Sequence, residues 1–256
     1  MMITYAENTW CPGCGNFGIQ NVVKNIFEKM DKKNIVIVGG IGCHAKILDY
    51  LDVNNFYSLH GRAVPAGEGI KLANPKLKVV VFVGDGDVYG EGISHLIFAA
   101  KRNIDITVVV HNNRVYGLTT GQFTPVSPFG FKGKSTPKGS VEHPLNPLSL
   151  MLDVGATFIG RTYTTKMKQM EDMITKAINH KGFSIVDILQ PCFTFYNTYA
   201  DYNKRTYDAK TPKSFEETEK LIREWDYNST TAKIPLGVFY KKNKKTYEEL
   251  ELIGKK

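Results

Sequence analysis

The sequence contains few cysteines, no long apolar run and no recognisable leader. Four cysteines in 256 residues are too few for a small scaffold held together by disulfides. The longest apolar runs, such as 79–83, extend for only five residues, so no segment is long enough to cross a bilayer. Residues 1–7 do not combine a basic start with an apolar stretch, so we expect no secretory signal, no membrane association and a cytoplasmic location. The 42% hydrophobic and 23% charged fractions are ordinary for a globular chain and exclude a disordered tail or a collagen-like repeat.

The chain carries a formal net charge of +8, from 33 basic and 25 acidic residues. Such a charge attracts acidic partners, which include nucleic acids, membrane surfaces and acidic proteins. The basic residues are spread along the chain, however, and the densest run is only 241–245. This distribution argues against a nucleic-acid-binding protein and leaves a solvated basic surface or an acidic protein partner.

Two hydrophobic patterns alternate along the first 200 residues. Short, largely apolar segments are typical of strands buried on both faces, and they occupy 35–38, 79–83, 106–110 and 184–189. Apolar side chains at helical spacing separate them, over 19–30, 93–100 and 167–178. The alternation predicts an α/β fold, doubly wound around a mostly parallel sheet.

Other regions lack such periodicity. The stretch from 39 to 69 is glycine-rich and loop-like, and Glu68 is expected to stabilise a turn there. The stretch 114–147, rich in Gly, Pro, Ser and Thr, is too long for a plain connector and is expected to be functional or mobile. We predict one domain over 1–200 and a helical or irregular extension over 201–256, packed on the domain or on a partner subunit.

Glycines and polar residues follow two of the predicted strands. Gly84-Asp85-Gly86-Asp87 comes after 79–83, and Asn112-Asn113 comes after 106–110. The carboxyl ends of neighbouring parallel strands meet at one sheet edge, where α/β proteins bind ligands. Glycines allow the backbone to approach a phosphate closely, and Asp85 and Asn113 offer the hard oxygen ligands that Mg²⁺ prefers. A backbone carbonyl nearby, that of Val115, is the expected third ligand.

This pair of segments resembles the signature of thiamine diphosphate enzymes. In that family the aspartate, the second asparagine and a carbonyl two residues later hold Mg²⁺ on the diphosphate. The resemblance therefore implies thiamine diphosphate and Mg²⁺ as cofactors, with Asp85, Asn113 and Val115 as the metal ligands.

The cysteines are Cys11, Cys14, Cys43 and Cys192, and their spacing is open to several interpretations. The pair Cys11-Pro12-Gly13-Cys14 is superficially similar to a thioredoxin redox pair, but no strand precedes it to place a helix N-terminus there. Structural zinc accepts four thiolates, although its sites usually present two tight pairs. An iron–sulfur cluster also takes four cysteines and tolerates dispersed ones. Disulfides are not expected without a secretory signal.

The residues around these cysteines resemble the β subunits of 2-oxoacid:ferredoxin oxidoreductases. The similarity extends from about Trp10 to Tyr199. Its motifs occur in the family's order: Trp10-Cys11-Pro12-Gly13-Cys14-Gly15, Gly40-Ile41-Gly42-Cys43, His60-Gly61-Arg62-Ala63, Pro65-Ala66-Gly67-Glu68-Gly69, Gly84-Asp85-Gly86-Asp87 and Pro191-Cys192-Phe193-Thr194-Phe195. In that family all four cysteines bind one [4Fe–4S] cluster near the thiamine.

The resemblance implies CoA-dependent oxidative decarboxylation of a 2-oxoacid, with electrons passing through the cluster to ferredoxin. It also implies an α subunit that supplies the pyrimidine-binding half and an activating glutamate, so that the single chain is inactive. Two alternatives need fewer cofactors: a non-redox thiamine diphosphate decarboxylase half-subunit, and a zinc-stabilised interaction module.

Further residues receive roles from the same resemblance. His60 and Arg62 are expected near the cofactor, His44 beside the cluster, and Lys46 at a substrate carboxylate. The residues expected to contact the cofactors are Gly42, Cys43, His60, Gly84, Asp85, Gly86, Asp87, Asn113, Val115, Gly117 and Leu118. We expect a slight preference for 2-oxoglutarate over pyruvate as the substrate. The cations of Lys46, and of Lys132 and Lys134 in the segment 129–147, suit the second carboxylate of 2-oxoglutarate.

Overall fold

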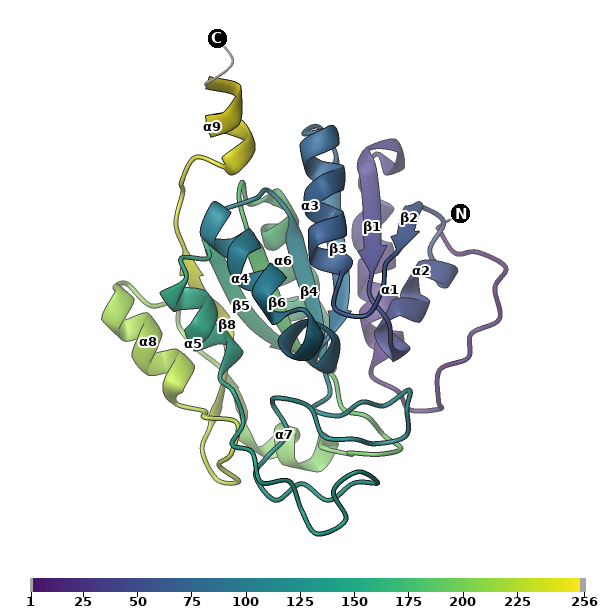
Figure 1. Ribbon diagram of the computed structural model, residues 1–256, viewed down its shortest axis with the longest axis vertical. Coiled ribbons are helices and arrows are strands. Elements are labelled where there is room, and N and C mark those ends of the chain that lie inside the picture. Colours follow the sequence, from purple (N-terminus) through teal and green to yellow (C-terminus); the bar gives the residue numbers. More distant parts are fainter. Residues whose placement is uncertain (1, 254–256) are drawn as a thin grey trace.

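The computed structural model describes residues 2–253, and within them one eight-stranded sheet has the order β2-β1-β3-β4-β6-β5-β8-β7 (Figure 1). The strands are β1 (Ile35–Gly39), β2 (Asn54–Tyr57), β3 (Lys78–Gly84), β4 (Thr107–Asn112), β5 (Phe158–Tyr163), β6 (Ser184–Leu189), β7 (Thr206–Asp208) and β8 (Ile234–Lys241). From β2 to β5 all neighbours are parallel, whereas β8 runs antiparallel to β5. The predicted mostly parallel α/β sheet is confirmed.

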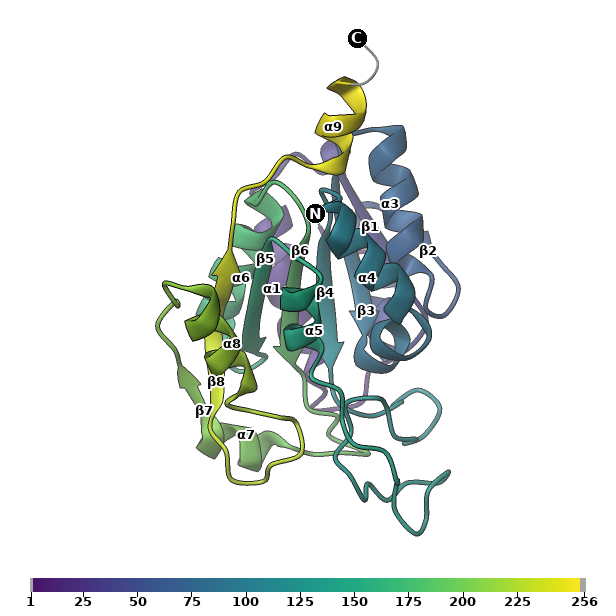
Figure 2. The same cartoon turned by 60° about the vertical axis from the view of Figure 1, so that its left-hand side comes forward.

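Helices cover both faces of the sheet (Figure 2). One face carries α3 (Ala63–Ala73), α4 (Ile93–Arg102), α5 (Pro147–Asp153) and α8 (Phe215–Arg223). The other carries α1 (Asn16–Phe27), α2 (Ile47–Tyr50) and α6 (Met167–Asn179). The remaining helices are α7 (Tyr199–Arg205) and α9 (Tyr247–Ile253), with the short turns η1 (Lys32–Asn34), η2 (Cys43–Lys46) and η3 (Gly86–Glu91). No helix in residues 2–253 is long and apolar enough to cross a membrane.

The packing of the core explains why residues 79–83 of β3 are all apolar. Val79, Val81 and Val83 pack under α3 and α4, while Val80 and Phe82 pack under α1 on the other face. A strand between two helical layers needs apolar side chains in both directions. The expected strands and helices of the first 200 residues are therefore found close to their predicted positions.

The region from 39 to 69 is not a continuous loop, and that expectation was wrong. It contains η2, α2, β2 and the first half of α3. Gly67 lies inside α3, where a Cβ would come within 2.8 Å of the Val81 Cγ2 atom. The glycine therefore permits close packing of the helix on β3. Glu68 does not stabilise a turn, since it lies in the helix and its carboxylate is 3.5 Å from Arg102.

The C-terminal segment contains helices, as expected (α8, α9 and most of α7), but it also contains two strands that were not expected. It contributes β8, which pairs with β5 and extends the central sheet, and the short β7 beside it. The segment thus shares the sheet and the core of the residues before it. The boundary at residue 200 stays a prediction.

Candidate active site

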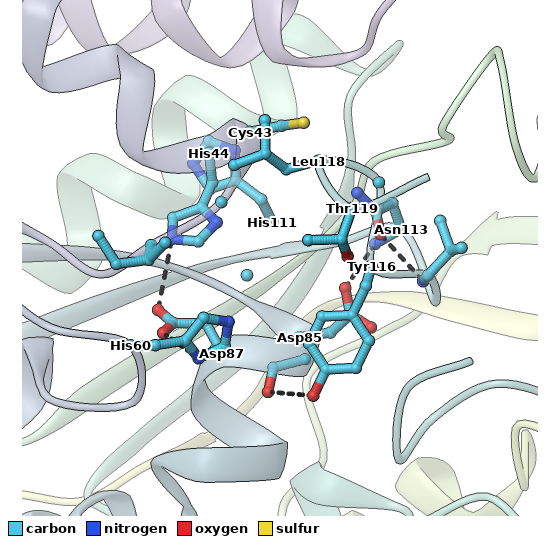
Figure 3. A pocket seen from close by; sticks show the side chains of 16 residues that line it. Cys43, His44, His60, Asp85, Asp87, His111, Asn113, Tyr116, Leu118 and Thr119 are labelled. Carbon is cyan, nitrogen blue, oxygen red and sulfur yellow. Dashed lines mark hydrogen bonds and ion pairs between the residues drawn. The ribbon is translucent and has the colours of Figure 1, made fainter. Parts of the chain in front are cut away.

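The loops after β1, β3 and β4 enclose a cavity at the carboxyl edge of the sheet (Figure 3). Parallel pairing of these strands brings their carboxyl ends together, as the sequence predicts. All eleven residues expected to contact the cofactors line this cavity: Gly42, Cys43, His60, Gly84, Asp85, Gly86, Asp87, Asn113, Val115, Gly117 and Leu118. The structure thus brings them together, while their contact with a cofactor stays a prediction.

Asp85 is one of two buried carboxylates that line this cavity, with 1% of its surface exposed; the other is Asp87, with 2% exposed. The Oδ1 atom of Asp85 accepts a hydrogen bond from the Asn113 N–H at 3.1 Å, and its Oδ2 atom accepts one from the Thr124 hydroxyl at 2.6 Å. Burial raises the pKa of Asp85 to about 7. In the part of the chain that the structure describes, no Lys or Arg forms an ion pair with it. A divalent cation beside Asp85 would therefore offset the cost of burying its charge.

Asn113 is held in place through both ends of its amide. Its Oδ1 atom accepts from the Val115 N–H at 3.0 Å, and its Nδ2 group donates to Gln190 Oε1 at 3.3 Å. The main-chain bond to Asp85 links the two predicted ligands directly. A carboxylate, an amide oxygen and a carbonyl from one loop pair form a hard donor set, so these residues fit Mg²⁺.

Packing requires glycine at several positions around the cavity. A Cβ on Gly86 would lie 2.3 Å from the Tyr116 ring, and one on Gly84 would lie 2.8 Å from His44 Nδ1. On the facing loop, a Cβ on Gly40 would lie 1.9 Å from Asp87 Oδ2. These glycines let Tyr116, His44 and Asp87 close in around the loop after β3.

Asp87 contacts two histidines. Its Oδ2 atom lies 3.3 Å from His44 Nε2, and its Oδ1 atom lies 3.3 Å from His60 Nδ1 and accepts from the Gly61 N–H at 2.6 Å. His60 Nδ1 is also 3.2 Å from Glu91 Oε2. Asp87 thus joins the loop after β3 to the segments around residues 44 and 60, and it places His60 at the cavity rim.

Four residues that line this cavity received no site role from the sequence, namely Ile41, His111, Tyr116 and Thr119, and His111 and Tyr116 make polar contacts there. His111 lies in the wall, where it hydrogen-bonds Asn16 at 2.8 Å, and burial lowers its pKa well below the usual value, so the ring is neutral. Tyr116 covers Gly86 and donates to Glu91. Their positions in the sequence could have indicated a place in the cavity wall, because His111 and Tyr116 lie close to the Asn112-Asn113 segment on either side.

A second cavity, of about 220 Å³, contains all four cysteines in its lining. Cys11 and Cys14 precede α1, Cys43 begins η2, and Cys192 follows β6. An ideal Cβ on Gly117 would lie 3.7 Å from the sulfurs of both Cys43 and Cys192. Burial raises the pKa of Cys14 to about 12 and also raises that of Cys43. Thiolates at these positions therefore need positive charge beside them.

Within residues 2–253, no three His, Cys, Asp or Glu side chains converge closely enough to hold one metal ion. This finding is compatible with both predicted sites. The proposed magnesium ligands include only one carboxylate, and the four cysteines line a cavity of about 220 Å³. A cluster of several irons separates its sulfur ligands more widely than a single zinc ion does.

The two cavities share a wall. Cys43, Asn113, Gly117 and Leu118 line both of them. Gly117 has no side chain to separate the cysteine sulfurs from the Asp85 side. Groups bound in the two cavities would therefore lie next to each other.

The basic residues expected at the site lie at different places. Lys46 lines the cysteine cavity, with its Nζ atom 3.4 Å from the Thr9 carbonyl. Arg62 lines neither cavity and donates to the carbonyls of Gly61 and Glu91, at 3.3 and 3.2 Å. Lys132 and Lys134 are exposed and also line neither cavity, so the structure does not bring them to the site.

Comparison with known proteins identifies the class of protein first. Residues 40–188 match the family model described as "Thiamine pyrophosphate enzyme, C-terminal TPP binding domain". This span includes every loop of the Asp85 cavity, so the sheet edge described above is that of a thiamine diphosphate-binding domain. Residues 191–251 match the family model for the C-terminal region of the pyruvate ferredoxin oxidoreductase beta subunit.

Individual relatives narrow the class. The chain is 41% identical to the 2-oxoacid:ferredoxin oxidoreductase subunit beta of Saccharolobus solfataricus, over 94% of this chain and 85% of that protein. It is 41% identical to the 2-oxoglutarate oxidoreductase subunit KorB of Mycobacterium tuberculosis, over 85% of this chain and 57% of that protein. The structure of 2-oxoglutarate:ferredoxin oxidoreductase from Magnetococcus marinus, with 2-oxoglutarate, coenzyme A and succinyl-CoA bound, superposes with a TM-score of 0.94 at 33% identity, covering 99% of this chain and 88% of that one.

The chain belongs to the family of β subunits of 2-oxoacid:ferredoxin oxidoreductases. It is accordingly a subunit of an oxidoreductase that works with partner subunits. The predicted family is confirmed, and it favours the redox subunit over the zinc-stabilised module and the non-redox half-subunit.

Proposed function

We propose that this chain, together with an α subunit, catalyses CoA-dependent oxidative decarboxylation of a 2-oxoacid and passes the electrons to ferredoxin. The observation that carries the proposal is the wall shared by the Asp85 cavity and the cavity of four cysteines. A redox thiamine enzyme needs its organic cofactor next to its first electron acceptor, and a non-redox decarboxylase needs no such arrangement.

The Asp85 cavity would hold the diphosphate end of the cofactor. Asp85 Oδ, Asn113 Oδ1 and the Val115 carbonyl would ligate Mg²⁺, while Gly84 and Gly86 leave the backbone accessible to phosphate oxygens. When bound, thiamine diphosphate supplies the carbon nucleophile and the electron sink for decarboxylation. The chain's own residues fix the diphosphate and, through the buried walls of the cavity, exclude water from it.

The cysteine cavity would hold one [4Fe–4S] cluster through Cys11, Cys14, Cys43 and Cys192. The presence of all four cysteines in the lining of one cavity supports a single centre held by four thiolates, as a [4Fe–4S] cluster is. The cations of a cluster would also offset the burial that raises the pKa of Cys14 and Cys43.

The partner would be an α subunit that binds the pyrimidine half and supplies the activating glutamate. The diphosphate-binding family model accounts for residues 40–188, and the remaining match, over 191–251, is to the C-terminal region of a β subunit. The acidic protein partner compatible with a net charge of +8 would be ferredoxin.

Metal analysis of the complex, purified without oxygen, tests the proposal. The expected result is about four irons per copy of this chain, with negligible zinc. Turnover of a 2-oxoacid with CoA and ferredoxin should require the α subunit, and the chain alone, supplied with cofactors and substrate, should be inactive. One zinc per chain and no iron would contradict the cluster, and turnover by the chain alone would contradict the split active site.

Substrate choice is tested at Lys46, which we propose as a partner of the second carboxylate of 2-oxoglutarate. The lysine is partly exposed in the cysteine cavity, and its long contact with the Thr9 carbonyl leaves the ammonium group able to reorient. The relative from Magnetococcus marinus was crystallised with 2-oxoglutarate. In Lys46→Ile, kcat/KM for 2-oxoglutarate should fall about tenfold more than kcat/KM for pyruvate, because a charge-assisted hydrogen bond contributes roughly 1.5–3 kcal/mol. Lys132→Ile, at an exposed lysine that lines neither cavity, is the control, and equal losses for both substrates in Lys46→Ile would refute the assignment.

A further inference from the structure

A buried polar cluster connects the C-terminal segment to the loop after β4. Asp187, Arg161 and Tyr227 are each 0% exposed, and they come from β6, β5 and the segment between α8 and β8. Arg161 Nε lies 3.3 Å from Asp187 Oδ2, the Tyr227 hydroxyl donates to the same oxygen at 2.9 Å, and Arg161 Nη2 donates to the Tyr227 hydroxyl at 2.9 Å. The resemblance to known enzymes assigns no role to these residues.

Asp187 extends the cluster to the residue before Asn113. Its second oxygen, Oδ1, accepts a hydrogen bond from Asn112 Nδ2 at 2.9 Å, and Asn112 is also fully buried. The Tyr227 hydroxyl and the Asn112 amide are thus both hydrogen-bonded to the Asp187 carboxylate, which links them.

The main chain of Tyr227 contacts the residue after Asn113. Its carbonyl accepts a hydrogen bond from Arg114 Nη2, and Arg114 Nε donates to the Val126 carbonyl at 2.7 Å. The indole of Trp225 stacks on the Tyr227 ring at 4.1 Å and lies 5.3 Å from the Arg114 guanidinium. Figure 2 shows the segment between α8 and β8 reaching the end of the sheet where these loops lie.

The backbone at both residues is in an unfavourable conformation. Arg114 has φ +61° and Tyr227 has φ +67°, in the left-handed region that non-glycine side chains seldom adopt. Such conformations persist where surrounding contacts impose them, and they concentrate at functional sites. Around Arg114 these contacts are the Ser127 hydroxyl on its carbonyl at 2.6 Å and the bonds from its guanidinium to the carbonyls of Val126 and Tyr227. Residues 225–227 therefore contribute to the conformation of the loop around Asn113.

We infer that Tyr227 is a positioning residue for the magnesium ligand Asn113, because it holds both neighbours of that ligand. Its hydroxyl acts through Asp187 on Asn112, and its carbonyl acts on Arg114. The inference rests on the magnesium site of the proposed function. It gives the C-terminal segment a role in cofactor affinity in addition to its place in the sheet.

Tyr227→Phe tests this inference, since it deletes the hydroxyl and keeps the ring and the carbonyl. The α–β complex is stripped of cofactors with a chelator, and thiamine diphosphate binding is measured by equilibrium dialysis across a range of Mg²⁺ concentrations. The Mg²⁺ concentration for half-maximal binding should rise about tenfold, as for other residues that orient metal ligands. In the same preparation kcat at saturating Mg²⁺ should return to within about twofold of the unmodified complex, because the ligand itself remains.

Tyr163→Phe is the matched control. It deletes another tyrosine hydroxyl on a 1% exposed residue, one that donates to Asn203 at 3.1 Å, whereas the side chains of Asn112 and Arg114 hydrogen-bond to Asp187, Val126 and Tyr227. It should leave the Mg²⁺ requirement unchanged. A Tyr227→Phe protein that melts earlier but has an unchanged Mg²⁺ requirement would show a merely structural role and would overturn the inference.

A second variant covers the case in which Tyr227→Phe does not fold. Asn112→Ala breaks the same connection at its other end and leaves the pairing of Arg161, Asp187 and Tyr227 intact, so it should raise the Mg²⁺ requirement similarly. Where both variants fold, their double mutant should show less than the sum of the two effects, because they interrupt one path. An unchanged Mg²⁺ requirement in Asn112→Ala would also overturn the inference.

Asp85→Asn in the same assay distinguishes failure of the inference from failure of the proposed magnesium site. A normal Mg²⁺ dependence in Asp85→Asn would contradict the magnesium site itself. Loss of Mg²⁺-dependent binding in Asp85→Asn, together with an unchanged Mg²⁺ requirement in Tyr227→Phe, would contradict only the role of Tyr227.

Discussion

Asp85→Asn should abolish Mg²⁺-dependent binding of thiamine diphosphate and reduce turnover at least ~100-fold. This loss lies at or above the upper end of the roughly 10–100-fold effects of residues that only orient a metal ligand. The substitution changes one oxygen to an amide nitrogen and leaves the size of the side chain nearly unchanged. It removes the single carboxylate among the proposed magnesium ligands. Calorimetric titration of the stripped α–β complex with thiamine diphosphate, with and without Mg²⁺, measures the effect.

The fold should survive this substitution. Burial opposes ionisation of Asp85 and outweighs the hydrogen bonds from Asn113 and Thr124 that favour the charged form, so its pKa is raised to about 7 and the charge is a net cost when no cation is bound. Removal of the charge therefore should not lower the melting temperature of the stripped complex.

Asp105→Asn is the reciprocal control, at the opposite edge of the sheet. Asp105 pairs with buried Lys71 at 2.6 Å and accepts from the Gly182 N–H at 3.0 Å. Its replacement leaves a buried ammonium without its partner, so the complex should melt earlier while its magnesium requirement stays normal. Strong Mg²⁺-dependent binding in Asp85→Asn would contradict the proposed site, whatever the stability of the variant.

The parts of the fold that the sequence predicted are those fixed by local pattern. Strand β3 has apolar residues on both faces, and this pattern appears directly in the sequence. Strand β5 was missed because it contains Arg161 and Thr162, polar residues that are nevertheless fully buried. Arg161 is compatible with a buried strand only because Asp187 and Tyr227, distant in sequence, satisfy it. No local pattern contains that information.

In the candidate site, too, features set by local sequence could be predicted, and features set by contacts between distant residues could not. Polar residues directly after strands, such as Asp85 and Asn113, could be placed at one edge because strand direction determines where they lie. Gly67 of α3 was misread because a glycine that permits close packing has the same sequence signature as a glycine in a turn. The contacts of Asp87 with His44 and His60, and those of Tyr227 around Asn113, join segments whose approach depends on the whole fold.

Cys192→Ser should abolish ferredoxin reduction while thiamine diphosphate binding remains. Cys192 lines the cysteine cavity and not the Asp85 cavity, so it separates the two proposed cofactors better than Cys43, which lines both. Serine keeps the shape but offers a poor ligand for iron, because iron–sulfur clusters are held by thiolates. Iron analysis and the Mg²⁺-dependent binding of thiamine diphosphate, both on the complex purified without oxygen, measure the two outcomes independently.

Thr194→Ala provides the comparison within the same cavity, since Thr194 lines the cysteine cavity and not the Asp85 cavity. This variant should keep its iron and its ferredoxin reduction. Retention of full iron content and activity in Cys192→Ser would remove Cys192 from the ligand set. Loss of thiamine diphosphate binding together with iron would instead mean that the shared wall formed by Cys43, Asn113, Gly117 and Leu118 depends on the cluster for its conformation. The two cavities would then be one cooperative unit, in which the cluster builds the thiamine site as well as accepting its electrons.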